Sequence, residues 1–229
     1  AQSANRARKS RGSRALLDPD LSELGFRQAE ALRQRLLEEH SLSSGSWLVV
    51  SSPMLRCLQT IAPAVRCLAL SRDSCVCHGG FFEYACVGTG FSGRRADQIL
   101  DDFPEFQSVG FLADGSWDYT GTHEKESEEE CRTRGARLVH FLRGRADAVA
   151  AAAAPGARPP VVVLCAHQTL ADLLCHVLLD GTGESWSYGD RKYNLHNAGI
   201  TELLLHPGGK VALETYNDYT HVSSVCRNF

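Results

Sequence analysis

The sequence predicts an α/β fold, because short apolar runs twice pass directly into a helical pattern. Five apolar residues in a row, Val161 to Cys165, follow two prolines and are typical of a strand buried on both faces. The apolar positions of residues 170–178 then recur at helical spacing. Residues 47–51 and the segment after them repeat this order of strand and helix. We therefore expect both strands in one sheet.

Composition limits the class of protein. With 229 residues, 43% apolar and 22% charged, the chain suits a soluble globular protein, and its net charge of −3 argues against a nucleic-acid binder. No apolar run approaches the roughly 20 residues that span a bilayer, and the opening residues lack the apolar core of a secretion signal, so we expect no membrane partner. Nine cysteines without paired spacing favour free thiols in a reducing compartment, which predicts an intracellular, cytoplasmic protein.

The first third of the chain contains a basic loop, a helix and a strand. Residues 6–14 are basic and favour a solvated loop, with guidance of an anionic substrate as the alternative. Ser22 is a good N-cap for a helix that we expect to end near His40. A buried strand is predicted over Trp47 to Ser51.

The next turn from strand to helix carries an arginine. Ser52 is expected as the N-cap and Pro53 as the first helical residue, which places Arg56 one turn into the helix. From there its planar fork could reach over the strand ends and bind a phosphate or carboxylate through two parallel bonds. Taken singly, such a residue is more often a surface arginine.

A long excursion follows over residues 71–122, and we expect it to be a substrate-selecting cap inserted between sheet elements. Its glycines do not follow a strand into a helix, so they indicate loop and not a dinucleotide site. Glu83 lies between aromatic residues, which would raise its pKa and suit a general acid; the alternative is a loop glutamate whose neighbours merely pack. A short helix over residues 96–103 is predicted to stop at Pro104, and the Cys-Val-Cys-His run at 75–78 lacks the second ligand pair of a metal site.

The last part of the chain contains a long helix, the second strand-to-helix turn and a hairpin. The acidic block 124–130 suits the positive end of a helix that continues into the alanine-rich segment 146–154. His167 lies where the strand at 161–165 becomes a helix, a point where backbone N–H groups and the helix dipole favour an anion. The alternative is a capping or core-edge histidine. Two runs joined at residues 207–209 predict an antiparallel hairpin.

The order of these motifs resembles the histidine phosphatases, whose best-known members are the cofactor-dependent phosphoglycerate mutases. The resemblance covers nearly the whole chain and implies a single domain over residues 1–229, with a three-layer α/β/α fold around a mostly parallel sheet. It rests on segments that include the specific Ser-Ser-Pro-x-x-Arg-x-x-Gln-Thr string, and these segments are Asp20 to Ala29, Ser51 to Thr60, the turn at His167, Asn197 to Thr201 and Asn217 to His221.

What the resemblance implies is covalent catalysis without a metal or cofactor on a small phosphorylated metabolite. In such enzymes a histidine in an Arg-His pair attacks phosphorus, a second histidine and two arginines bind the phosphoryl oxygens, and an acid protonates the leaving oxygen. Carried across, Arg56 is one arginine, His167 is the second histidine with the Gln168 N–H nearby, and Glu83 is the acid. Asn5 is implied as a further phosphate-binding residue.

The chain departs from the family pattern at its start. No Arg-His pair precedes the Asp20 segment, and residues 1–5 look like the tail of an Arg-His-Ala-Gln-Ser-x-x-Asn opening, with Asn5 one position early. We therefore expect that the first central strand and the nucleophile are missing from this chain, that the isolated polypeptide is inactive, and that it is poorly stable because two neighbouring strands lose their partner. The alternative to an enzyme is a module that binds a phosphorylated ligand or serves in assembly.

Overall fold

The structure is a computed structural model that describes residues 2–3, 18–42, 45–86, 93–117, 126–153, 156, 158–206 and 208–226. Asn5 and the basic stretch 6–14 therefore lie outside the described residues. The elements, in chain order, are α2 (Glu23–Leu42), β1 (Trp47–Ser51), α3 (Leu55–Leu68), the 3-10 turn η1 (Arg72–Ser74), β2 (Cys75–His78), α4 (Ala96–Asp102), β3 (Gln107–Val109), α5 (Glu128–Ala152), β4 (Val161–Cys165), α6 (Gln168–Asp180), β5 (Ile200–Leu205), β6 (Val211–Asp218) and α7 (Thr220–Cys226).

A parallel sheet of four strands, in the order β3-β2-β1-β4, forms the middle of the molecule. β1 and β4 pair along their whole length, with Ser51 opposite Cys165. The pairing continues one residue further, where the N–H of Ser52 donates to the carbonyl of Cys165 at 2.9 Å. The two predicted turns from strand to helix therefore start side by side at the carboxyl ends of β1 and β4.

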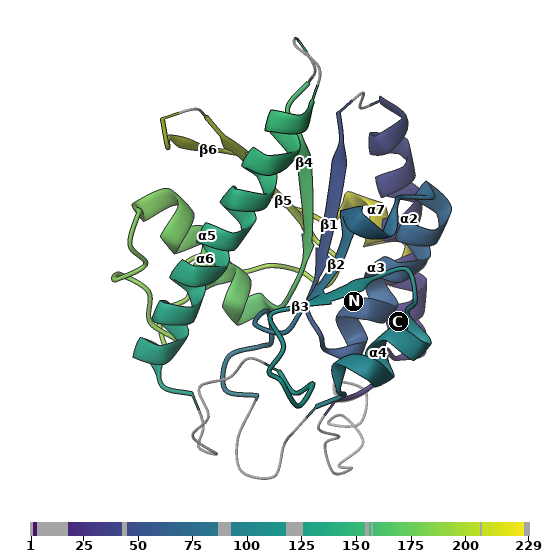
Figure 1. The fold of residues 1–229 in the computed structure, drawn as a ribbon, viewed down its shortest axis with the longest axis horizontal. Helices are drawn as coiled ribbons and strands as arrows, with labels where there is room; N and C mark the ends of the chain where they lie inside the picture. The colour runs from purple at the N-terminus through teal and green to yellow at the C-terminus, as the bar shows by residue number, and fades with distance from the viewer. Residues whose placement is uncertain are drawn as a thin grey trace.

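Helices cover both faces of this sheet, so the predicted three-layer α/β/α fold is confirmed (Figure 1). On one face, α2, α3 and α4 pack on one apolar cluster with alternate residues of β1, including Trp47 and Val49. On the other face, α5 and α6 pack on Leu48 and Val50. Successive side chains of a strand point to opposite faces, so the unbroken apolar run of β1 serves both layers.

Two strands of the sheet, β2 and β3, lie inside the segment 71–122, where the sequence predicts an inserted cap. The cysteines of β2 are fully buried members of the core. These two strands belong to the sheet, which corrects the prediction for this part of the segment. That the rest of the segment selects the substrate remains a prediction.

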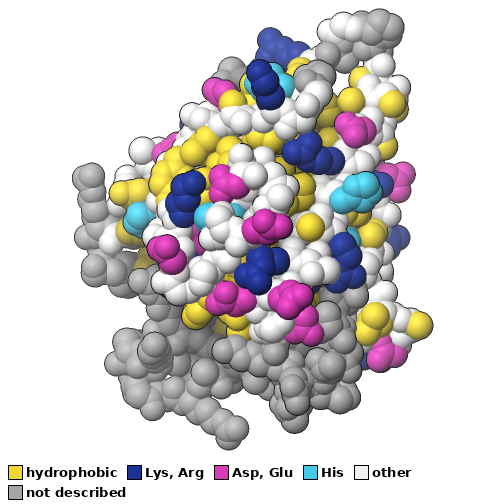
Figure 2. Space-filling model, turned by 90° about the vertical axis from the view of Figure 1, so that its left-hand side faces the viewer, with side chains coloured by type: hydrophobic (Ala, Val, Ile, Leu, Met, Phe, Trp, Pro, Cys, Tyr) yellow, Lys and Arg dark blue, Asp and Glu magenta, His cyan; other side chains and the backbone are white. Residues whose placement is uncertain are grey.

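The predicted hairpin is confirmed, and it forms a second, two-stranded sheet of β5 and β6. Among the described residues no strand pairs with the second edge of β4, and all five β4 residues are only half-buried, whereas all five β1 residues are buried. Four large side chains of the hairpin are at least 40% exposed, namely Leu204, Leu205, Leu213 and Tyr216. Figure 2 shows apolar side chains gathered on the face seen from the hairpin side. That a central strand is missing from this chain remains a prediction.

Helix boundaries follow local capping where the sequence supplies a cap. Ser22 is confirmed as the cap of α2, because its hydroxyl accepts from the Gly25 N–H at 3.1 Å, although the helix continues two residues past His40 to Leu42. α3 starts later than predicted, at Leu55 and not at Pro53. Its first N–H is satisfied from outside the helix, by the carboxylate of Asp18 at 3.0 Å. Among the described residues, no helix is both long and apolar enough to cross a bilayer.

Candidate functional site

Arg56 and His167, the two residues predicted at the strand ends, are in direct contact. Arg56 Nη2 lies 2.9 Å from Nδ1 of His167, although 111 residues separate them in the chain. Ser52, which ends the first turn, places its hydroxyl 2.7 Å from the other ring nitrogen, Nε2. The parallel pairing of β1 with β4 brings these three side chains together at one edge of the sheet.

The contacts of His167 determine its tautomer. An arginine can only donate, so Nδ1 accepts from Arg56, and the ring proton lies on Nε2, which donates to Ser52. The Ser52 hydroxyl also accepts from the N–H of Met54 at 3.2 Å. Burial lowers the pKa of His167, and the Arg56 charge lowers it further. His167 is therefore a neutral imidazole that is only 6% exposed.

This geometry leaves most of the Arg56 fork available. Among the described residues, the Arg56 side chain forms a hydrogen bond to His167 alone, and it is half-buried at the ends of the strands. Both His167 nitrogens are already bonded to protein atoms. An anion that approaches would meet the guanidinium first and would have to displace Ser52 from Nε2 to receive a hydrogen bond from the imidazole.

A thiol packs against the imidazole. Cys57 Sγ lies 3.6 Å from Nε2 and 3.7 Å from Nδ1 of His167, and the thiol donates to the carbonyl of Ala166 at 3.3 Å. Burial raises the pKa of Cys57 well above its ordinary range, so it stays a neutral thiol. Its contribution at this position is packing against the ring, not nucleophilic chemistry.

Glu83 reaches the same region from the loop after β2. Its carboxylate accepts from the backbone N–H groups of Thr169 at 3.3 Å and Leu170 at 3.1 Å, in the first turn of α6, and from that of Tyr84 at 2.9 Å. Burial raises its pKa, and this outweighs the lowering by the backbone donors and by the Arg56 charge. The amino end of α6, where the sequence predicts an anion, thus holds the carboxylate of the chain itself.

Gln168 has its side chain in a structural role. Its amide nitrogen donates to the carbonyl of Tyr193 at 2.9 Å, and its amide oxygen accepts from the N–H of Leu195 at 2.6 Å. These bonds hold the loop after α6 against the start of that helix. The proposed contribution of Gln168 to phosphate binding is its backbone N–H, which remains a prediction.

Two acidic residues for which the sequence predicted no role support the turn before Arg56. Asp18 accepts from the first N–H of α3, and burial raises its pKa. Gln59 in α3 accepts from the Leu21 N–H at 2.8 Å and donates to Asp20 at 2.9 Å. The Gln of the Ser-Ser-Pro string therefore joins α3 to the segment before α2, which explains why the two motifs occur together. Ser52, in the same string, belongs to the site through its contact with His167, whereas the sequence predicted only a helix cap for it.

The C-terminal motifs of the chain gather elsewhere. Asn217 accepts from the His196 N–H at 2.7 Å, and its amide nitrogen lies 2.7 Å from Nδ1 of His196. Residues 194–197, with α2 and α7, line a cavity of about 780 Å³ whose lining does not include Arg56, Glu83 or His167. These motifs therefore build the joint between β5 and α7.

The site consists of an arginine, a neutral imidazole and a carboxyl with a raised pKa. Among the described residues, no group of three or more His, Cys, Asp or Glu side chains is placed to hold a metal ion. The three groups together can bind an oxyanion and can supply a proton near it. None of the three groups alone indicates an oxyanion site. Their convergence at the ends of two parallel strands does.

The chain matches a known protein family over most of its length. A sequence model of the histidine phosphatase superfamily (branch 1) matches residues 2–218. No curated protein matches the chain closely enough to count as a relative.

Several solved structures are similar in fold. One described as mycobacterial hydrolase 1 is 25% identical, with a TM-score of 0.59, 94% of this chain covered and 93% of that chain. Mycobacterial glucosyl-3-phosphoglycerate phosphatase with inorganic phosphate is 24% identical, with a TM-score of 0.58 and coverage of 97% and 95%. The α-ribazole phosphatase of Shigella flexneri is 15% identical, with a TM-score of 0.55 and coverage of 87% and 85%. At such identities the last two likenesses show the fold alone.

Proposed function

Because the chain belongs to the histidine phosphatase superfamily, branch 1, we propose that the natural protein transfers the phosphoryl group of a small phosphorylated metabolite to water or to a second hydroxyl. The observation that carries the proposal is the contact of Arg56 with His167 at the paired ends of β1 and β4. Two of the similar structures are phosphatases of small compounds, glucosyl-3-phosphoglycerate phosphatase and α-ribazole phosphatase, which supports a small substrate.

The proposed roles follow from the contacts. Arg56 binds phosphoryl oxygens through the part of its fork that His167 does not occupy, and His167 donates from Nε2 after Ser52 is displaced. Both groups stabilise the negative charge of the phosphoryl oxygens in the transition state. Glu83, whose pKa is raised by burial, protonates the leaving oxygen.

The proposed phosphoryl transfer takes two steps. A nucleophilic imidazole nitrogen attacks phosphorus, the ester P–O bond breaks, and the leaving oxygen takes the proton of Glu83. Water or a second hydroxyl then attacks the phosphohistidine and gives its proton to the Glu83 carboxylate, and the N–P bond breaks. The enzyme returns to its starting state with Glu83 protonated.

We propose that the nucleophile is a histidine other than His167, supplied by a strand that completes the sheet beyond β4. Two observations support this. His167 already uses both ring nitrogens, and the second edge of β4 has no strand partner among the described residues. The intact mass and amino-terminal sequence of the protein from its source test the idea, since a strand that ends in Arg-His is expected.

The experiment that tests the function is a hydrolysis screen of phosphate monoesters with the full natural protein. We expect turnover of at least one small monoester, and the Glu83→Gln variant should lose most of it for alkyl esters, whose leaving oxygen needs a proton. Because Glu83 must be protonated to act, the wild-type activity should fall as the pH rises through its raised pKa. Phosphate binding without any turnover would instead support the binding module.

A further inference from the structure

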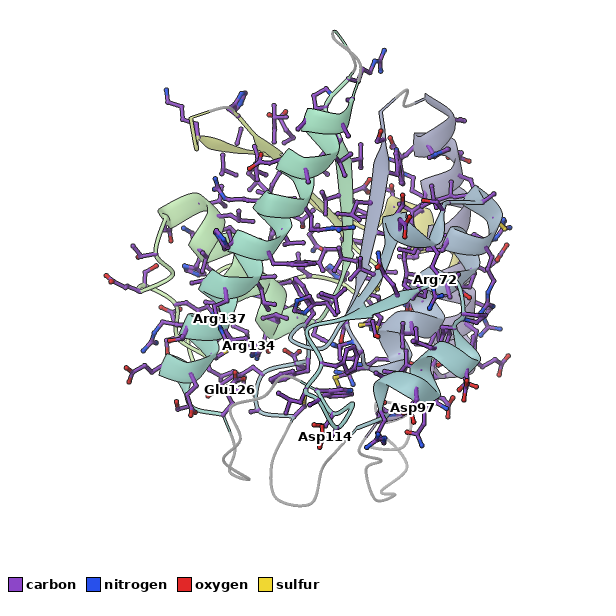
Figure 3. The ribbon with its side chains drawn as sticks, in the orientation of Figure 1. Arg72, Asp97, Asp114, Glu126, Arg134 and Arg137 are labelled. Atoms are coloured by element: carbon purple, nitrogen blue, oxygen red, sulfur yellow. The ribbon has the colours of Figure 1, made fainter. Side chains whose placement is uncertain are left out.

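Arg134 is a buried cation that the proposed reaction does not use. It lies in α5, and it is only 1% exposed. Its Nε and Nη2 donate to the two carboxylate oxygens of Glu126 at 2.7 and 2.6 Å. Figure 3 shows the two residues together beside the lower end of α5. A buried pair of this kind is by itself weak evidence of any role, because its desolvation cost offsets its attraction.

The remaining donors of Arg134 point to a role. Nη1 donates to two backbone carbonyls of the loop after β2, that of Gly80 at 2.8 Å and that of Phe82 at 3.1 Å. The carbonyl of Phe82 belongs to the peptide group whose nitrogen is that of Glu83. The guanidinium therefore holds the backbone directly before the proposed acid, through two bonds of fixed relative direction that a planar fork can make.

The ring of Phe82 completes the hold. The guanidinium carbon of Arg134 lies 3.8 Å from the centre of this ring, within the range of a cation–π contact. The same ring stacks with Trp117 and packs with Met54, the residue that caps α3 two positions before Arg56. The loop that carries Glu83 is thus fixed on one side by α5 and on the other by the start of the helix that carries Arg56.

We propose that Arg134 is a positioning residue for Glu83, which it keeps at the start of α6 and next to the phosphoryl group. This inference rests on the proposed function, in which Glu83 is the acid. It adds a requirement that a simple core ion pair would not have. Loss of the Arg134 contacts should impair proton transfer to the leaving oxygen and should leave phosphate binding intact.

The test compares two substrates and two arginine variants in the full natural protein. Arg134→Lys keeps the charge but cannot reach Glu126 and both carbonyls at once, and Arg137→Lys, an exposed residue of the same helix, is the matched control. For an alkyl phosphate, kcat/KM of Arg134→Lys should fall about 10- to 100-fold, mainly through kcat. For p-nitrophenyl phosphate, whose leaving group needs no proton, it should change less than about threefold.

A double-variant cycle separates positioning from general destabilisation. In the Glu83→Gln background, Arg134→Lys should have little further effect on the alkyl ester, because the group that it positions is already gone. Equal losses on both substrates, or losses that multiply in the double variant, would overturn the inference while the proposed function stands. A wild-type protein that hydrolyses no phosphate monoester of the screen would overturn the proposed function itself, and this inference with it.

Folding of the variants is checked by thermal melting before any kinetics. If Arg134→Lys does not fold, Glu126→Asp provides the same comparison, because the shorter side chain keeps the charge but draws the guanidinium away from the two carbonyls. The same contrast between the alkyl and aryl esters is expected for it, and equal losses on both would overturn the inference.

Discussion

Replacement of Arg56 by lysine tests the anion site most simply. The change keeps the positive charge but removes the planar fork, which in the structure bonds Nδ1 of His167 at 2.9 Å and leaves its other donors for an anion. A lysine can serve the imidazole or the anion, but not both in fixed geometry. We therefore expect the loss of one hydrogen bond to a charged group.

The magnitude follows from that single bond. A hydrogen bond to a charged group contributes about 1.5–3 kcal/mol, so the affinity for inorganic phosphate should fall roughly 10- to 150-fold. Isothermal titration of the full natural protein with inorganic phosphate measures this. Arg66→Lys is the control in the same helix, because its side chain is 54% exposed and its partner is Glu105.

The control should bind phosphate as the wild type does. Phosphate affinity within about threefold of wild type in Arg56→Lys would refute the assignment, because neither bidentate binding nor the link to His167 would then contribute. A loss of folding is distinguished by the melting curve, and Arg56→Gln then gives a second comparison, in which a shorter, uncharged amide replaces the guanidinium.

Three further predictions concern stability. Burial lowers the pKa of His167 below its ordinary 6.5, so the neutral imidazole contributes its full stability above pH 6.5 and loses it as the pH falls below that value. The Tm of the wild type should therefore fall more on acidification than the Tm of His167→Asn. Parallel curves of Tm against pH would contradict this. Gly135→Ala places its Cβ 2.8 Å from a side chain of α6 and should cost about 1–3 kcal/mol in urea unfolding, whereas Gly144→Ala, with nothing within 4 Å, should be neutral or stabilising; equal effects would contradict the packing. Asp172→Ala leaves the indole N–H of Trp186 and the backbone N–H of Tyr193 without an acceptor. We expect the free energy of unfolding in urea to fall by more than about 1 kcal/mol, and a smaller decrease would contradict a stabilising role for these two bonds.

The meeting of Arg56 and His167 was predictable from sequence because it depends on one rule. Both residues follow apolar strands that run directly into helices, and parallel strands end at the same edge of a sheet. The register was not predictable, but any parallel pairing of adjacent strands brings such turns together. The resemblance to a family added the expected role of each residue and not their proximity.

The strands β2 and β3 escaped prediction for a physical reason. They contain only four and three residues, and β2 reads Cys-Val-Cys-His, in which no alternation of polar and apolar residues marks a strand. Both lie in a segment rich in glycine and aromatic residues, where loop signals dominate. Their strand character comes from pairing with β1, which is a long-range contact that local pattern does not contain.

The surroundings of Glu83 show the limit of electrostatic prediction. The start of α6 favours an anion, as the sequence indicates, but the pattern cannot distinguish a substrate from a carboxylate of the same chain. Glu83 is 84 residues before His167 in the sequence, and only the folded loop places its carboxylate there. The contacts of Arg134 that hold this loop have no local sequence signal either.

The most direct test of phosphoryl transfer through this site is to trap the phosphoenzyme. The full natural protein is mixed with a radiolabelled phosphate monoester, quenched in alkali and digested, and the labelled peptide is identified. We predict an acid-labile phosphohistidine on a residue other than His167, with much less label in Arg56→Lys. Label on His167 itself, or turnover without any phosphohistidine, would contradict the assignment of His167 and Arg56 as the groups that bind the phosphoryl oxygens.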